Sequence, residues 1–219
     1  ADIYGPSAPI LLKPEKNVTT NADQTISPAE ACGVRYMSMG FLAQNDAPLI
    51  WRGPMAHKAV QQCMFDTKWG QLDYLLVDLP PGTGDVHLTI AQTVRVSGAV
   101  IVSTPQDLGL TISKKTLRMF EKTDVPILGM IENMSYFICD HCDEKHHLFG
   151  DVSVESDAAE MGMPFLGRIG INSDLVRQTK TGIPICESEP DSGISRDFHS
   201  IASKIAKRIS VMYHQPAAA

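Results

Sequence analysis

The sequence predicts an α/β protein with a parallel sheet flanked by helices. Three apolar runs, at residues 72–79, 98–104 and 126–131, have the length and β-branched content of buried strands. Between them, residues 86–97 and 108–123 carry apolar side chains at helical spacing. Successive strands begin about 25 to 28 residues apart with a helix between them, which is the pattern of βαβ units.

Further helices are predicted on both sides of this βαβ region. They cover residues 54–66, with Pro54 in the first turn, residues 154–161 and residues 195–213. Residues 17–28 are polar and poor in aromatic side chains, so they are expected to form a surface loop.

Length and composition predict one hydrophobic core. The chain has 219 residues, of which 43% are hydrophobic and 20% charged. We expect a single domain over residues 1–214, an irregular insert at about 134–151 and a frayed tail at 215–219.

Charge and hydropathy argue against a nucleic-acid partner and against a transmembrane helix. The formal net charge of −6 provides no basic field, so a nucleic acid is not expected as a partner. No apolar run approaches the roughly 18 to 20 residues of a transmembrane helix.

The five cysteines do not form a disulfide framework, because their number is odd and they are scattered through the chain. Cys139 and Cys142 form a close pair. Cys32, Cys63 and Cys186 have no partner nearby in the sequence and are expected to be buried as small apolar side chains.

A carboxylate follows the first predicted strand, in the string LLVDLPPGTGD. Ligands of open α/β sheets bind at the carboxyl edge of the strands, where Asp78 would lie. A carboxylate there can hold the water shell of Mg²⁺, and Gly82 lets the backbone approach a phosphate. The alternative is an ordinary strand end followed by a Pro-Gly turn. The phosphate-binding G-x-x-x-x-G-K-[ST] loop is absent, because no lysine directly follows a glycine.

Eight short motifs, taken together, resemble the Mrp/Nbp35 family of P-loop ATPases that carry iron–sulfur clusters. In the family order they are residues 2–7 (DIYGPS), 37–42 (MSMGFL), 51–55 (WRGPM), 78–85 (DLPPGTGD), 103–107 (STPQD), 132–135 (ENMS), 139–142 (CDHC) and 149–150 (FG). Within the family the motifs are most similar to the mitochondrial Ind1 branch, which is implicated in the assembly of respiratory complex I.

The resemblance implies a role for five residues. Asp2 would be the switch I aspartate that orients the attacking water, and Asp78 would be the Walker B carboxylate. Gly82 would be the switch II glycine, and Asn133 would read the adenine, although a turn-forming Asn is the alternative. Gln106 would also contact the nucleotide.

The same resemblance implies a segment that this sequence does not contain. Family members begin with a strand, the P-loop, a helix and a second strand, which we expect upstream of Ala1. The expected fold is therefore a P-loop NTPase fold without its first strand and P-loop. The family hydrolyses ATP with Mg²⁺, but this chain as given is expected to be inactive as an ATPase.

Cys139 and Cys142 have the spacing at which two thiolates ligate one metal centre. A [4Fe-4S] cluster needs four ligands, so two chains would each contribute one pair in a symmetric homodimer. One alternative is a zinc site within a single chain that adds His141, His146 or His147. Another is a redox dithiol, although the pair lies in a late insert rather than at an early helix.

The resulting hypothesis is an iron–sulfur carrier or scaffold that delivers a [4Fe-4S] cluster to apoproteins, with ATP in the full-length form. Its expected location is the mitochondrial matrix, with the bacterial cytoplasm as the alternative. Two other interpretations remain open at this point: a nucleotide-switch ATPase in which the CxxC pair holds structural zinc, and a partner or remnant without enzymatic activity.

Overall fold

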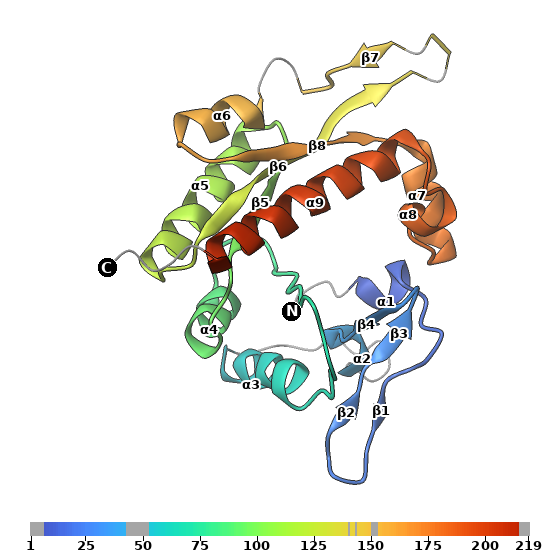
Figure 1. The fold of residues 1–219 in the computed structure, drawn as a ribbon, viewed down its shortest axis with the longest axis vertical. Helices are drawn as coiled ribbons and strands as arrows, with labels where there is room; N and C mark the ends of the chain where they lie inside the picture. Colours follow the sequence, from blue (N-terminus) through green and yellow to red (C-terminus); the bar gives the residue numbers. More distant parts are fainter. Residues whose placement is uncertain (1–6, 43–52, 140, 143, 150–152, 215–219) are drawn as a thin grey trace.

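The structure is a computed structural model of the whole chain (Figure 1). It describes residues 7–42, 53–139, 141–142, 144–149 and 153–214. No helix in these ranges is long and apolar enough to cross a lipid bilayer.

A four-stranded sheet forms the centre of the fold. Its parallel strands are β5 (Ala99–Ser103), β6 (Ile127–Ile138) and β8 (Phe165–Ile171), with β6 in the middle. The short β7 (Lys145–His146) returns antiparallel onto the last residues of β6, so that the two form a hairpin beyond the sheet (Figure 1). The prediction of an α/β fold with a parallel sheet is confirmed.

Helices cover both faces of this sheet. On one face α5 (Asp107–Lys122) and α6 (Val154–Glu160) pack against β5 and β6. On the other face α9 (Gly193–His214) crosses β8, with α8 (Ile185–Ser188) beside it (Figure 1).

Strand residues point alternately to the two faces of the sheet, and they contribute to one hydrophobic core under each layer of helices. The first contains Ile101, Phe120, Val125, Met130, Val154 and Ala158, and the second contains Leu166, Ile169, Ile185, Ile194 and Ile201.

Three helices pack together beside the sheet. They are α2 (Met39–Leu42), α3 (Gly53–Phe65) and α4 (Asp85–Thr93), and their shared core consists of Met39, Ala59, Val60, Val86 and Ile90. Leu79 contacts both this core and the core under α5, and so it joins the two parts.

The remaining elements are short. The first described helix is α1 (Ala8–Leu11), which contacts α7 (Ser173–Thr181). Two small hairpins follow α1 in the chain: β1 (Thr19–Thr20) with β2 (Ile26–Ser27), and β3 (Ala29–Ala31) with β4 (Val34–Tyr36).

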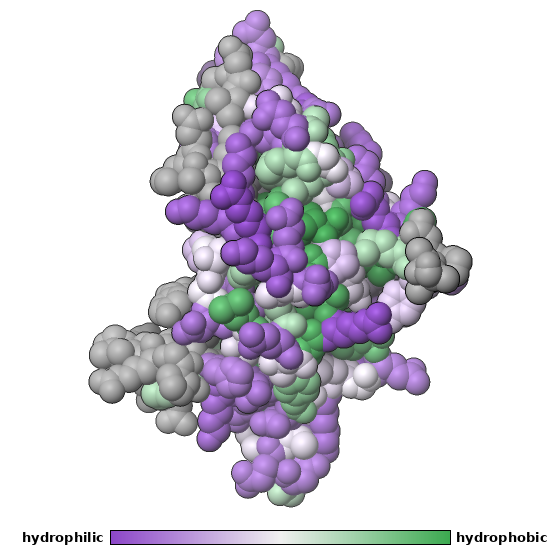
Figure 2. All heavy atoms as spheres, turned by 90° about the vertical axis from the view of Figure 1, so that its left-hand side faces the viewer, coloured by the Kyte–Doolittle hydropathy of each residue, from purple (hydrophilic) through white to green (hydrophobic). Residues whose placement is uncertain are grey.

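The strand predicted at residues 72–79 is not formed, and this prediction is wrong. The segment is extended but belongs to no ladder, and Leu76 is 87% exposed. An apolar run becomes a strand only when a neighbour accepts its backbone hydrogen bonds. Among the described residues none pairs with 72–79, and β5 pairs with β6 alone. Hydrophobic side chains also gather at mid-height on the molecular face drawn in Figure 2.

The other predicted elements are found with small shifts of their ends. The five predicted helices correspond to α3, α4, α5, α6 and α9. The insert expected as irregular from residue 134 instead begins as strand, because β6 continues to Ile138. The surface loop expected at 17–28 contains the β1–β2 hairpin, and β8 was not predicted. The tail at 215–219 lies outside the described residues.

Candidate metal centre

The β6–β7 hairpin determines the position of the cysteine pair. Phe137 pairs with His146 and Ile138 with Lys145, and the Cys139 amide donates to the Glu144 carbonyl at 2.9 Å. Cys139 therefore continues the ladder by one residue beyond β6, and Cys142 lies in the turn that connects the two strands.

The two thiols and one imidazole come together at this hairpin. The ligand atoms of Cys139, Cys142 and His146 all lie within 4.8 Å of one another. Cys139 is half-buried, and Cys142 and His146 are exposed. Within the described chain, neither His141 nor His147 belongs to this group. The three side chains offer a soft donor set at the surface, of the kind that binds zinc or iron.

Contacts to the rest of the fold hold the base of the hairpin. The Lys145 ammonium lies 3.6 Å from the centre of the Tyr136 ring, and the Tyr136 hydroxyl donates to Asp197 of α9 at 3.4 Å. The ring also covers Gly170 of β8, where a Cβ would lie 2.6 Å from Tyr136 Cε2. Burial, together with the Asp197 carboxylate, raises the pKa of Tyr136, which keeps its proton for this bond.

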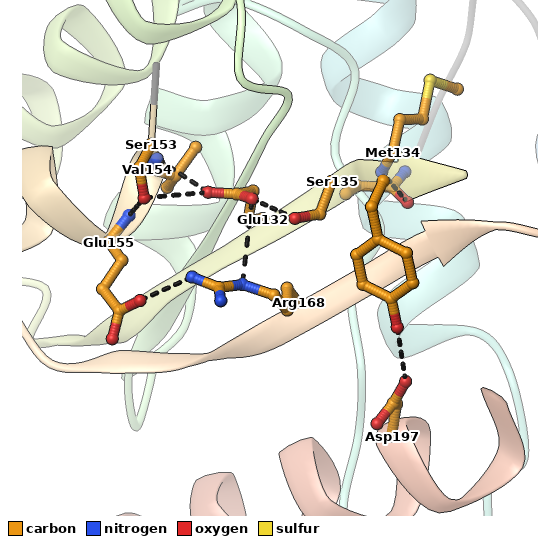
Figure 3. A network of polar contacts seen from close by, with 10 residues as sticks. Glu132, Met134, Ser135, Ser153, Val154, Glu155, Arg168 and Asp197 are labelled. Carbon is orange, nitrogen blue, oxygen red and sulfur yellow. Dashed lines mark hydrogen bonds and ion pairs between the residues drawn. The ribbon is translucent and has the colours of Figure 1, made fainter. Parts of the chain in front are cut away.

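A buried glutamate holds β6 just before it leaves the sheet (Figure 3). Glu132 is 3% exposed and accepts hydrogen bonds from Ser135 Oγ and, at 2.8 Å, from the Val154 amide. Arg168 Nε lies 3.9 Å from the carboxylate, which is an ion pair but too long for a hydrogen bond. Arg168 also pairs with the exposed Glu155. Sequence reasoning missed this network, although a glutamate directly after an apolar strand was a usable signal.

The strand ends bring two of the predicted nucleotide residues to one edge of the sheet. Ser103, the last residue of β5, pairs with Glu132 of β6. Gln106, three residues after β5, and Asn133, within β6, therefore both lie at the carboxyl end of β5. Gln106 precedes α5 and is exposed. Asn133 accepts a hydrogen bond from the Met134 amide at 3.0 Å, and Met134 has a φ of 55°. The Asn133 side chain therefore stabilises a local backbone bend, which is the kind of role that the turn-forming alternative gave it.

Asp78 and Gly82 lie on the segment that leads into α4. Asp78 is exposed. Gly82 has a φ of +100°, a conformation that favours glycine, and its carbonyl accepts a hydrogen bond from Thr116 of α5 at 3.2 Å. Asp2 lies outside the described residues.

The other three cysteines are half-buried rather than fully buried as predicted. Cys63 packs against the core of α2, α3 and α4, and its Sγ lies 3.5 Å from Met39 Sδ. Burial raises the pKa of the Cys63 thiol, so this group remains protonated at neutral pH and is a poor metal ligand. Cys186 borders the core under α9.

Comparison with known families decides where the chain belongs. Residues 1–206 match the family described as "ParA: NUBPL iron-transfer P-loop NTPase". The chain belongs to the NUBPL iron-transfer P-loop NTPase family. This confirms the resemblance that the eight motifs indicated and the P-loop NTPase fold class.

Two relatives illustrate the range of the NUBPL family. An Arabidopsis thaliana protein named "Iron-sulfur protein required for NADH dehydrogenase, mitochondrial" is 41% identical over 99% of this chain and 69% of its own length. An "Iron-sulfur cluster carrier protein" of Aquifex aeolicus is 47% identical over 94% of this chain and 57% of its own length. The chain thus spans between about half and two thirds of these relatives, which come from both mitochondria and bacteria.

A solved structure supports the same fold. The nucleotide-binding protein of Archaeoglobus fulgidus, determined in complex with ADP and with cobalt found in it, aligns with a TM-score of 0.71. It is 36% identical, and the alignment covers 87% of this chain and 74% of that protein.

Proposed function

We propose that this chain carries a [4Fe-4S] cluster as cargo, held between Cys139 and Cys142 of two copies, and passes it to apoproteins. The observation that carries the proposal is the position of the pair at the tip of a projecting hairpin, with Cys142 exposed (Figure 1). Relatives named as iron–sulfur carrier and transfer proteins support the class of cargo.

The homodimer follows from the number of ligands. A [4Fe-4S] cluster takes four thiolates, whereas one hairpin offers two. Two copies related by a two-fold axis would place both pairs on that axis and complete the set. A cluster at the surface between subunits is accessible to a recipient protein, and apo iron–sulfur proteins, including those of respiratory complex I, are the proposed recipients.

We propose that nucleotide binding belongs to the whole protein of which this sequence forms at least a part. Asp78, Gly82, Gln106 and Asn133 would contribute to an ATP and Mg²⁺ site at the carboxyl edge, with Asp2 as switch aspartate. The shared edge of Gln106 and Asn133 and the φ of Gly82 support this assignment. The proposed compartment is the mitochondrial matrix, with the bacterial cytoplasm as the alternative.

Anaerobic reconstitution with iron and sulfide tests the cluster. We expect about four irons and four sulfides per dimer, in one chromatographic peak with the mass of two chains. Cys139→Ser should abolish cluster binding, whereas Cys186→Ser, a half-buried cysteine beside the core under α9, should retain it. A cluster retained in Cys139→Ser, or a monomer that takes up zinc but no iron and sulfide, would refute the proposal.

A further inference from the structure

One histidine lies on the same face of the β6–β7 hairpin as the first cysteine. Side chains alternate between the two faces of a strand. Cys139 is two positions beyond Phe137, whose cross-strand partner is His146, so Cys139 and His146 are diagonal neighbours on one face. Lys145 points to the opposite face, where it covers Tyr136. His147 comes one position after His146 and is therefore directed away from the cysteines.

The distances match a single metal ion. In a tetrahedral site, with metal–sulfur and metal–nitrogen bonds near 2.3 and 2.0 Å, two sulfur ligands lie about 3.8 Å apart, and a sulfur and a nitrogen lie about 3.5 Å apart. The three ligand atoms of Cys139, Cys142 and His146 already lie within 4.8 Å of one another. A shift of about 1 Å, within the reach of side-chain rotation at an exposed turn, would bring them to bonding distance.

The donor set indicates which ion would bind. Thiolate and imidazole ligands select zinc and other soft or borderline divalent ions over magnesium and calcium. Two thiolates also neutralise the charge of a divalent ion at a surface that is partly exposed. Three protein ligands leave a fourth position for water, which is typical of open rather than closed zinc sites.

We propose that a single chain binds one divalent ion, such as zinc, through Cys139, Cys142 and His146, with the fourth position open to solvent. This site requires no second copy of the chain. The same two cysteines would hold the cluster, so the ion and the cluster exclude each other. This exclusion rests on the proposed function. The ion-bound monomer is then the cluster-free form of the protein.

Cobalt(II) titration of the reduced full chain under nitrogen tests the site, with Co²⁺ as the probe for zinc. We expect the ligand-field absorption of tetrahedral cobalt with thiolate ligands, saturation at one ion per chain, and the mass of a monomer by native mass spectrometry. His146→Ala should weaken cobalt binding at least about tenfold, the lower limit seen even for residues one shell further from a metal. The matched control His147→Ala should bind within about twofold of wild type. Far-UV circular dichroism of both variants confirms that the fold is retained.

The outcomes separate this proposal from the cluster assignment. Unchanged cobalt affinity in His146→Ala, an equal loss in His147→Ala, or saturation at one ion per two chains would overturn it. None of these results affects the cluster, which is tested by reconstitution of Cys139→Ser. Conversely, a cluster retained in Cys139→Ser would refute the proposed function, while the His146 result would still decide the mononuclear site.

Discussion

Replacement of Glu132 by alanine should strongly destabilise the fold, because this carboxylate is buried and has four partners, namely Ser135, Ser153, Val154 and Arg168. The side chain is 3% exposed. Its loss leaves the Val154 amide at the start of α6 without its 2.8 Å hydrogen bond and removes the acceptor of Ser135. It also removes one of the two carboxylates that pair with Arg168, which keeps its ion pair with Glu155 (Figure 3).

The magnitude follows from these contacts. A hydrogen bond to a charged group contributes about 1.5 to 3 kcal/mol. The ion pair with Arg168 adds less than about 1 kcal/mol, because the Arg168 side chain is 37% exposed and the two groups are 3.9 Å apart. The contacts share one carboxylate and are not additive, so we expect Glu132→Ala to lower the free energy of unfolding by about 3 to 4 kcal/mol. Glu155→Ala removes the exposed partner of the same arginine and should cost less than about 1 kcal/mol.

Urea unfolding followed by far-UV circular dichroism measures both variants. With an m-value of roughly 2 to 3 kcal/mol/M, the midpoint of Glu132→Ala should fall by about 1 to 2 M. The midpoint of Glu155→Ala should move by less than about 0.5 M. Equal shifts for the two variants, or an unchanged midpoint for Glu132→Ala, would refute the reasoning that burial makes this contact strong.

Two further predictions concern other sites. His87 is buried beside Phe120, and burial lowers its pKa below 6.5, so the unfolded chain gains the proton first as pH falls. Stability should therefore decrease as the pH falls through 6.5 towards the lowered pKa. Over this pH range the urea midpoint of His87→Gln should decrease less than that of the wild type. The midpoint of the exposed control His199→Gln should decrease as much as that of the wild type. Gly129 has a φ of +147°, and a Cβ there would lie 2.5 Å from the Pro164 carbonyl oxygen. Gly129→Ala should cost about 1 to 3 kcal/mol in thermal unfolding. The control Gly193→Ala, in the first turn of α9, where a Cβ would meet nothing nearer than 3.8 Å, should change the stability by less than about 0.5 kcal/mol or raise it.

The sequence predicted the part of the candidate site in which both the residue types and their spacing fit a metal centre. The CxxC pair indicates a metal centre because two thiolates three residues apart reach the same ion, and its hairpin presents them together. The sequence offered three histidines near this pair without a way to choose among them. The choice of His146 depends on the register between β6 and β7, which pairs residues across a turn and is not encoded in local spacing.

Local patterns were sufficient for helices α3, α4, α5, α6 and α9 and for strands β5 and β6, because apolar periodicity and strand length are properties of short segments. They also carried the family motifs. They did not predict α1, α2, α7 and α8. The state of residues 72–79 depended on something else: the same apolar run is a strand or an exposed segment according to whether another strand lies beside it. The Glu132 network likewise joins residues from β6, α6 and β8 that are far apart in the sequence. Such pairings arise only when the chain has folded, since hydrogen bonds and ion pairs depend on distances that no local pattern specifies.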